Sequence, residues 1–259
     1  MGKLDGKVAV ITGCASGLGK QHALRFANEG ANLAICDIQE GKLLETKRLC
    51  EENGAEVVAL RCDVGRYNEL EGFVDEATKR FGTVDVLLNN AHRITDLRTF
   101  LEFSVEDLEI EMHTSLYASW HMMKLCFPYM KDKPGAGASV INTSSKGGIE
   151  GTPFHAAYAA AKEAIRGLSR VVAREWGQYN IRVNTVSPGG WTDNVDTQLH
   201  KRSPEVQEWA RAAFRDNPFK KIGDPYSDVS PIFVFLASDE SHWMTGQNLH
   251  ADGGAWISA

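Results

Sequence analysis

The chain has 259 residues, a formal net charge of −6 at pH 7, and 43% hydrophobic residues. This length is usual for a single α/β sheet with covering helices, and no linker, repeat or low-complexity segment divides residues 1–259 into two domains. No cluster of lysine and arginine gathers aromatic residues, which argues against a nucleic-acid partner. No stretch approaches about 18 consecutive apolar residues, and the first residues lack the apolar core of a signal peptide, so we expect a cytoplasmic protein without a membrane segment.

Cysteine and histidine are scattered along the chain. The five cysteines are odd in number and show no Cys-x-x-Cys spacing, and the eight histidines include no His-x-x-x-His pair. Neither a disulfide framework nor a metal site is expected from this distribution.

The chain opens with an apolar run at residues 8–11, followed at once by Gly13, Gly17 and Gly19. An unbroken β-branched run bounded by glycines predicts a buried strand, and the amphipathic stretch from Leu18 to about Asn28 predicts a helix. Glycines allow backbone N–H groups to approach a pyrophosphate, and the positive end of the helix adds to the attraction. The spacing is Gly-x-x-x-Gly-x-Gly, which differs from the commoner Gly-x-Gly-x-x-Gly pattern and by itself is also compatible with a plain tight turn.

A second strand, residues 31–36, ends at Asp37 at about the distance from the glycines where a dinucleotide-binding unit places the carboxylate that reads the ribose. A carboxylate there binds the adenosine hydroxyls and repels a 2′-phosphate, which predicts NAD as cofactor. The alternative is that Asp37 only starts a turn before Gly41. Further strands are predicted at residues 56–62, 84–88, 139–143, 181–186 and 247–251.

Apolar strands alternate with longer helical stretches from residue 7 to about 186. This alternation predicts a parallel sheet with helical crossovers on both faces, an α/β fold with a doubly wound seven-stranded sheet in three αβα layers. Residues 104–107, Ser-Val-Glu-Asp, predict a capping box at the start of a long helix.

Tyr158 and Lys162 stand four residues apart, a spacing that places a phenol and an ammonium on the same face of a helix. The positive charge is expected to lower the pKa of the phenol, as an acid or base working at neutral pH requires. The same spacing is common on solvated helices, so the pair needs support from its neighbours. Ser145, just past the strand at residues 139–143, offers a hydroxyl that could stabilise charge on a substrate oxygen.

Together these motifs resemble the short-chain dehydrogenase/reductase family in its NAD-dependent form, over nearly the whole chain. The residues that carry the resemblance are Thr12-Gly13-x-x-x-Gly17-x-Gly19, Asp63, Asn89-Asn90-Ala91, Ser145, Tyr158-x-x-x-Lys162, Asn184, Pro188-Gly189 and Thr245-Gly246-x-x-x-x-x-Asp252-Gly253-Gly254. The resemblance implies a Rossmann fold, a homo-oligomer (tetramer or dimer), and oxidation of a secondary alcohol or reduction of a ketone.

The resemblance also implies roles for individual residues. Tyr158 is the general acid or base, Lys162 lowers its pKa and holds the nicotinamide ribose, and Ser145 binds the substrate oxygen. The implied cofactor contacts are Gly13, Ser16, Gly17, Leu18, Gly19, Asp37, Ile38, Asp63, Val64, Asn90, Ala91, Tyr158, Lys162, Pro188, Gly189, Trp191 and Thr192. Thr192 lies one position earlier than the family pattern suggests, so Asp193 is the alternative for that contact.

Two departures affect the expected proton path. The family usually has an asparagine in the long helix after the fourth strand, and here Ser115 stands in that place. We expect Ser115, with an added water, to take over this catalytic role, while His113 is the alternative. His92 follows Ala91 where a glycine is usual, and we expect a loop histidine without a catalytic task.

The substrate is less well defined by the sequence. Residues 192–218 lie where relatives carry a lid, and Val195, Leu199, Trp209, Ala212, Ala213 and Phe214 with Trp191, Phe154 and His155 are expected to line an apolar pocket or, alternatively, to form a helix interface. A weaker resemblance favours hydroxysteroids or bile acids, with sugars, polyols and 3-hydroxyacyl thioesters as alternatives. Other classes left open are a non-catalytic NAD(H)-binding sensor or scaffold, and a dehydratase or epimerase.

Overall fold

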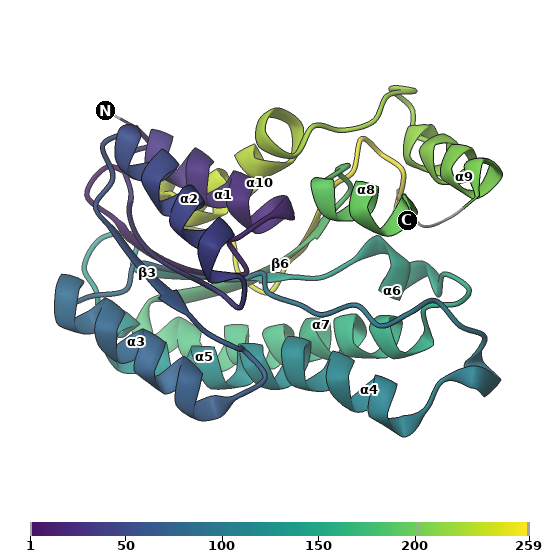
Figure 1. Ribbon diagram of the computed structural model, residues 1–259. Coiled ribbons are helices and arrows are strands. Elements are labelled where there is room, and N and C mark those ends of the chain that lie inside the picture. Colours follow the sequence, from purple (N-terminus) through teal and green to yellow (C-terminus); the bar gives the residue numbers. More distant parts are fainter. Residues whose placement is uncertain (1, 201–202, 258–259) are drawn as a thin grey trace.

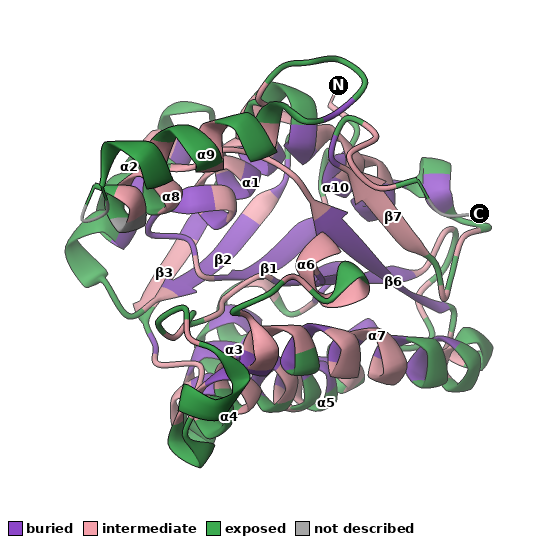
Figure 2. Cartoon of the chain, turned by 90° about the vertical axis from the view of Figure 1, so that its right-hand side faces the viewer, coloured by how far each residue is buried: buried purple, intermediate pink, exposed green. Residues whose placement is uncertain are grey.

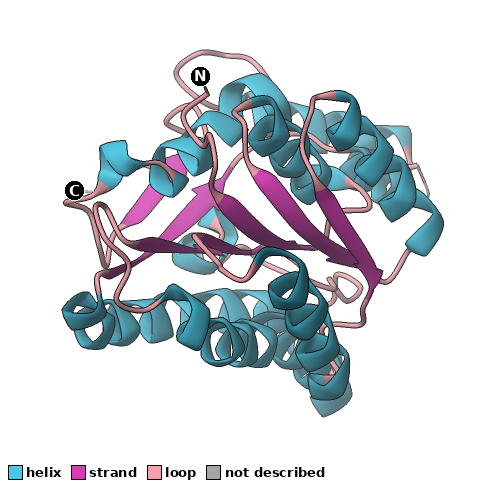
Figure 3. Cartoon of the chain, turned by 90° about the vertical axis from the view of Figure 1, so that its left-hand side faces the viewer, coloured by secondary structure: helices cyan, strands magenta, loops and turns pink. Residues whose placement is uncertain are grey.

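Seven parallel strands form one sheet in the order β3-β2-β1-β4-β5-β6-β7 in a computed structural model, which describes residues 2–200 and 203–257. The doubly wound, seven-stranded fold predicted from the sequence is confirmed (Figure 3). The strands are β1 (Val8–Thr12), β2 (Asn32–Asp37), β3 (Val57–Arg61), β4 (Val86–Asn89), β5 (Ala138–Thr143), β6 (Ile181–Pro188) and β7 (Asn248–Ala251).

Helices cover both faces of the sheet and make a three-layer structure (Figure 1). The layer drawn above the sheet contains α1, α2 and α10, and the layer below contains α3, α5 and α7. The α-helices are α1 (Gly17–Asn28), α2 (Glu40–Glu52), α3 (Tyr67–Phe81), α4 (Val105–Met112), α5 (Ala118–Met130), α6 (Lys146–Glu150), α7 (Ala156–Trp176), α8 (Asp193–Leu199), α9 (Pro204–Arg215) and α10 (Ser230–Ala237). Shorter turns of helix are η1 (Phe100–Glu102), η2 (His113–Tyr117), η3 (Gly177–Tyr179), η4 (Pro225–Val229) and η5 (Asp239–Ser241).

The central strands are buried on both faces, which explains why their sequences are apolar without alternation. All five residues of β1 are buried, and Figure 2 shows the strands buried beneath helices whose outer faces are exposed. One core cluster includes Phe26 and Phe233, and the other includes Phe73 and Met122. Burial of such large apolar side chains contributes about 1.5–3 kcal/mol each relative to exposure.

The long helix after β4 begins with the predicted capping box. The Ser104 hydroxyl accepts a hydrogen bond from the Asp107 N–H at 3.1 Å, and the Asp107 carboxylate accepts one from the Ser104 N–H at 3.0 Å. The helix then runs through α4, the π-helical turn η2 and α5 without a connecting loop. A π turn inserts an extra residue and changes the direction in which its side chains point. Ser115 lies in this turn and is buried.

The strand order reverses between β1 and β4. The chain proceeds outward from β1 through β2 to β3, and it returns to the other side of β1 with β4. The loops that follow β1 and β4 therefore lead to opposite sides of the sheet and leave a crevice between them. Open α/β sheets bind ligands in a crevice of this kind.

Candidate active site

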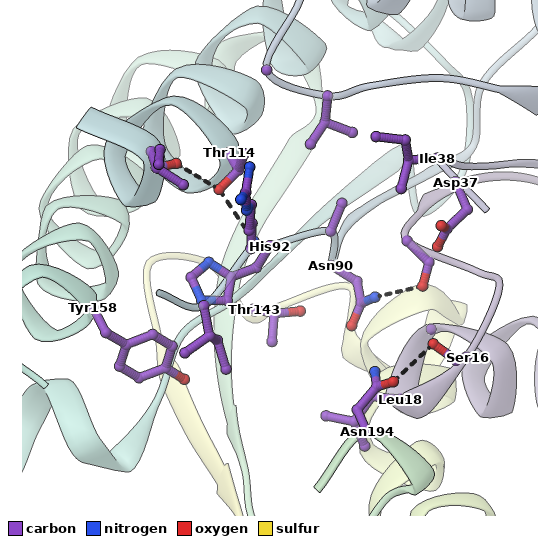
Figure 4. A pocket seen from close by; sticks show the side chains of 18 of the residues that line it. Ser16, Leu18, Asp37, Ile38, Asn90, His92, Thr114, Thr143, Tyr158 and Asn194 are labelled. Atoms are coloured by element: carbon purple, nitrogen blue, oxygen red, sulfur yellow. Dashed lines mark hydrogen bonds between the residues drawn. The ribbon is translucent and has the colours of Figure 1, made fainter. Parts of the chain in front are cut away.

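A cavity of about 830 Å³ lies at the carboxyl ends of the strands where the order reverses. It extends from the glycine turn after β1 to α7, and in Figure 4 Tyr158 and His92 lie at one end while Asp37 and Ile38 lie at the other. Residues predicted from the sequence that line this cavity are Gly13, Ser16, Leu18, Gly19, Asp37, Ile38, Asp63, Val64, Asn90, Ala91, Ser145, Tyr158, Lys162, Pro188 and Thr192.

The glycine turn has the conformation that its sequence predicted. Gly13 has φ +76°, and a Cβ there would lie 2.8 Å from the Ala91 Cα, while a Cβ on Gly19 would lie 1.9 Å from the Gly13 carbonyl oxygen. Only glycine fits this packing of turn against helix. The Asn90 amide donates to the Thr12 and Gly13 carbonyls at 3.0 and 3.2 Å, so the loop after β4 is tied to the turn.

Asp37 ends β2 at the far side of the cavity from Tyr158. One carboxylate oxygen accepts a hydrogen bond from the Ala15 N–H at 3.0 Å, and the other accepts from the Gln39 N–H at 2.9 Å. These bonds hold the carboxylate in one orientation at the cavity wall. The Asp63 carboxylate is held similarly by the Gly65 N–H at 3.0 Å.

Tyr158, Lys162 and Ser145 meet at the inner end of the cavity. Tyr158 and Lys162 lie on α7, and Ser145 caps the short helix α6 that follows β5. The Lys162 side chain is buried, with 3% of the residue exposed, and its Nζ donates to the Thr143 carbonyl at 3.0 Å. This Nζ lies 5.8 Å from the centroid of the Tyr158 ring.

The ionisation of these groups differs from what the sequence predicted. Burial raises the pKa of the Tyr158 phenol, hydrogen bonding with Ser145 opposes this, and the Glu111 carboxylate raises it further. Burial lowers the pKa of Lys162 to about 8, and Glu111 works in the opposite direction. The expectation that the protein itself lowers the pKa of Tyr158 was therefore wrong, because the loss of water around the phenol dominates.

Ser115, which stands at the expected asparagine position, contacts His92. The Ser115 Oγ and the His92 Nδ1 are 2.6 Å apart, and the His92 ring lies edge-on to the Tyr158 ring with 5.0 Å between centroids. His92 is therefore a buried member of the site, contrary to the expectation of a loop histidine without a task there. His113, the alternative, is half-exposed and faces Glu109, with 3.3 Å between Nε2 and a carboxylate oxygen.

Glu111, in the last turn of α4, was not among the residues that the sequence indicated. It is 1% exposed, and one of its oxygens accepts hydrogen bonds from the Thr95 N–H and hydroxyl at 2.7 and 2.9 Å. Its other oxygen lies 3.2 Å from the His92 Nε2. The sequence does not predict that Glu111 is buried, because it stands in a helix with several other acidic residues. Only the packing of the folded chain shows that it belongs to the site.

Three of the expected cofactor contacts lie off the cavity wall. The Gly17 N–H donates to the Asp193 carboxylate at 2.8 Å. Gly189 packs against Asp252, where a Cβ would approach the Asp252 Cβ to 2.6 Å. The Trp191 indole N–H donates to Asp196 at 2.8 Å and its ring packs edge-on to Phe214, which turns it away from the cavity.

The predicted lid forms two helices, α8 and α9, but it does not assemble the expected apolar pocket. Val195 lines the cavity, whereas Trp209 is 70% exposed and Phe154 is 56% exposed. No residue of α9 is buried, although the helix is strongly amphipathic. Its apolar side chains therefore contribute little to the cavity in this arrangement.

Membrane-spanning helices, metal-binding clusters and disulfides were also considered. No helix within residues 2–200 and 203–257 is long and apolar enough to cross a membrane. The same residues contain no group of three His, Cys, Asp or Glu side chains able to hold a metal ion. All five cysteines are free and buried.

Comparison with known proteins identifies the family. The family described as Enoyl-(Acyl carrier protein) reductase matches residues 13–255. The chain is 38% identical to the 12alpha-hydroxysteroid dehydrogenase of a Clostridium species over 261 residues, covering 98% of each chain, and 38% identical to the trans-4-hydroxycyclohexanecarboxylate dehydrogenase of Sinomonas cyclohexanicum, covering 96% of this chain and 92% of that one. The chain belongs to the short-chain dehydrogenase/reductase family, whose members are oxidoreductases that bind a nicotinamide cofactor.

A solved structure agrees with this assignment. The solved structure of a 7α-hydroxysteroid dehydrogenase complexed with NADH and 7-oxo glycochenodeoxycholic acid matches this chain with a TM-score of 0.87 at 29% identity, covering 97% of this chain and 94% of that one. The cavity described above fits such a cofactor on its own geometry. It joins a glycine turn at a helix N-terminus to a fixed carboxylate at one end and to Tyr158 and Lys162 at the other.

Proposed function

We propose that this protein is an NAD-dependent dehydrogenase that interconverts a secondary alcohol on a saturated ring and the corresponding ketone, with a hydroxysteroid or bile acid as substrate. The observation that carries the proposal is the meeting of Ser145, Tyr158 and Lys162 at the inner end of a cavity that reaches Asp37. A structural role for these three side chains would not require a phenol, an ammonium and a hydroxyl to converge on one open cavity.

The chemistry assigned to the side chains follows from their positions. In alcohol oxidation the Tyr158 oxygen removes the hydroxyl proton, and in ketone reduction it returns that proton. Ser145 donates a hydrogen bond to the substrate oxygen as negative charge develops there. Lys162 binds the cofactor ribose and favours the ionised phenol. The bound nicotinamide accepts or supplies the hydride.

Asp37 supports NAD as the cofactor. Its two oxygens are fixed by backbone N–H groups at the end of the cavity opposite Tyr158, where the adenosine ribose of an extended dinucleotide would lie. A fixed carboxylate there accepts bonds from the ribose hydroxyls and repels a 2′-phosphate. Gly13, Ser16, Leu18, Gly19, Asp63, Val64, Asn90, Ala91, Pro188 and Thr192 are the further contacts proposed.

The relatives support the class of substrate. The names 12alpha-hydroxysteroid dehydrogenase and trans-4-hydroxycyclohexanecarboxylate dehydrogenase both describe a hydroxyl group on a saturated six-membered ring, and both proteins are 38% identical to this chain. A rigid ring alcohol presents its carbinol hydrogen in one direction, which suits a site whose acid and hydroxyl donor are fixed on α7 and α6.

The test is a panel of alcohols and ketones with NAD(H) and NADP(H), followed by absorbance of the reduced nicotinamide. The panel contains bile acids that differ in the position of the hydroxyl group, hydroxycyclohexanecarboxylates, polyols and 3-hydroxyacyl thioesters. We expect steady turnover with ring alcohols and NAD. Tight NAD binding without turnover of any member would favour a sensor or scaffold, and turnover confined to thioesters would favour 3-hydroxyacyl substrates.

A homo-oligomer in the cytoplasm is part of the same proposal. Tyr117 in η2, Trp120 on α5 and Val171 on α7 are exposed by 40%, 47% and 54%, and such apolar side chains are ones that a second copy would cover. Free, buried cysteines suit a reducing compartment. Light scattering after gel filtration measures the oligomer directly, and a monomer would contradict this part.

A further inference from the structure

Three polar side chains lie buried next to Tyr158 and have no part in the function proposed above. Glu111 comes from the end of α4, Ser115 from the π turn η2, and His92 from the loop after β4. Glu111 and Ser115 are each 1% exposed, and the His92 side chain is 9% exposed. Burying a carboxylate is costly unless it gains partners, so the contacts of these three groups require a physical explanation.

His92 connects the other two residues. Its Nδ1 is 2.6 Å from the Ser115 Oγ, and its Nε2 is 3.2 Å from the Glu111 carboxylate. The Nε2 and the near oxygen of Glu111 do not form a hydrogen bond with each other, and neither has a hydrogen-bond partner among the described residues. A Ser115 hydroxyl that donates to Nδ1 places the ring proton on Nε2, where it faces the carboxylate.

The titratable and charged groups that face Glu111 come from three directions. His92 belongs to the loop after β4, Tyr158 and Lys162 belong to α7, and His155 immediately precedes α7. Burial raises the pKa of Glu111, while the Thr95 hydrogen bonds and the Lys162 charge lower it. Burial and the Lys162 charge hold the pKa of His92 well below its usual range. Glu111 and His92 therefore form a buried pair beside the reacting phenol, and burial disfavours the charged form of each.

We propose that Glu111 is a positioning residue that sets the ionisation of Tyr158 and Lys162, with its carboxylate held by Thr95 and placed beside the His92–Ser115 pair. Its negative charge favours the ammonium of Lys162 and opposes the phenolate of Tyr158. The carboxylate thus moves the working range of the acid-base pair to higher pH. No atom of Glu111 contacts the substrate in this scheme, and His92 forms part of the cavity wall. The proposal rests on the proposed function only for its catalytic consequence.

The sign follows from electrostatics. Removing the carboxylate charge lowers the pKa of Tyr158, because phenolate is no longer repelled, and it also lowers the pKa of Lys162, because the ammonium loses an attractive partner. Both limbs of the pH profile of kcat/KM for alcohol oxidation should move to lower pH in Glu111→Gln, which keeps the shape of the side chain. Glu106→Gln is the matched control, because it removes an exposed carboxylate from the same helix.

Tyrosine ionisation is the readout that does not depend on turnover. The tyrosinate absorbance of the cofactor-free protein is titrated with and without Tyr158→Phe, and the difference isolates Tyr158. In the Glu111→Gln background its midpoint should lie about one pH unit lower, and Glu106→Gln should leave it in place. Glu111→Met, which also removes the charge, should shift the midpoint in the same direction.

A Tyr158 midpoint that is the same in Glu111→Gln and Glu106→Gln, in proteins with native circular dichroism, would overturn the proposal. If Glu111→Gln does not fold, an unshifted midpoint in Glu111→Met would overturn it equally. The shift of the Tyr158 midpoint does not depend on the result of the substrate panel. A shifted midpoint without turnover of any alcohol would remove the proposed function and leave the electrostatic role of Glu111 intact.

Discussion

The two walls of the cavity differ in the chemical groups that form them. The catalytic wall, formed by α4, η2 and α7, places Tyr158 and Lys162 at the cavity and contains Glu111 away from the cavity surface. The phosphate wall is formed by the turn after β1, the end of β2 and the start of α8, and there the Ala15 and Gly17 N–H groups donate to the carboxylates of Asp37 and Asp193. On the catalytic wall, we expect activity to depend on which side chain holds a proton. On the phosphate wall, we expect cofactor binding to depend on backbone geometry and on repulsion between anions.

Asp193 shows this contrast with Glu111 most clearly. Neither carboxylate lines the cavity, but Glu111 is buried with a lysine nearby, whereas Asp193 is exposed and accepts a hydrogen bond from the Gly17 N–H at 2.8 Å. The latter donor lies at the start of α1, where the helix dipole favours an anion. A cofactor phosphate at this position would meet the Asp193 charge, so we expect Asp193 to affect cofactor binding and Glu111 to affect proton transfer.

The largest effect is expected from Tyr158→Phe on the catalytic wall. The ring still packs beside His92, but the transferable proton is lost, so kcat should fall by about 10²- to 10⁴-fold while NAD affinity is kept. Steady-state kinetics and a separate measurement of NAD binding by fluorescence check the two parts. Activity within about tenfold of the parent would mean that another group is the acid.

Lys162→Met tests the cost of burying a charge on the same wall. The pKa of Lys162 is lowered from 10.5 to about 8, so the folded protein binds fewer protons than the unfolded chain between these values, and its stability rises with pH in that window. Below the window the buried ammonium costs up to about 3 kcal/mol. Lys162→Met should therefore be more stable than the parent near neutral pH, and its advantage should shrink by about pH 10. Urea unfolding of both proteins at the two pH values measures this, and a constant difference would contradict it.

Asp37→Ala tests repulsion on the phosphate wall. The parent should prefer NAD over NADP, because a fixed carboxylate faces the position of the 2′-phosphate. Loss of one charge near another at this surface should narrow the preference in kcat/KM by about 10- to 100-fold. The matched control is Asp75→Ala, an exposed acidic residue on α3. A parent that uses NADP as well as NAD would remove the assignment of Asp37.

The smallest effect is expected from Asp193→Ala. Freeing the Gly17 N–H and removing a negative charge at the helix N-terminus should tighten NAD binding by about 2- to 5-fold. Isothermal titration at two salt concentrations checks the result, since the gain should be larger at low salt. Weaker binding in the variant would show that Asp193 orders the glycine turn and does not compete with phosphate.

The sequence by itself determined most of the fold and the centre of the site. Apolar strand runs, the glycine turn, Asp37 and the spacing of Tyr158 and Lys162 are local patterns, and each occupies the predicted place in the structure. These patterns predict the structure reliably because strand burial, tight turns and helix faces depend on residues a few positions apart. The capping box at Ser104 was readable for the same reason.

The tertiary structure alone decided the surroundings of Tyr158 and the position of the lid. His92, Glu111 and Ser115 come from different segments, and only the packing of the β4 loop on the π turn brings them within hydrogen-bonding range. The pKa of Tyr158 rises against expectation because desolvation depends on everything that surrounds the phenol, which no spacing in the sequence records. Trp191 and α9 do not line the cavity, and the sequence could not show this for a similar reason. An amphipathic pattern determines which face of a helix is apolar, but it does not determine which part of the protein that face contacts.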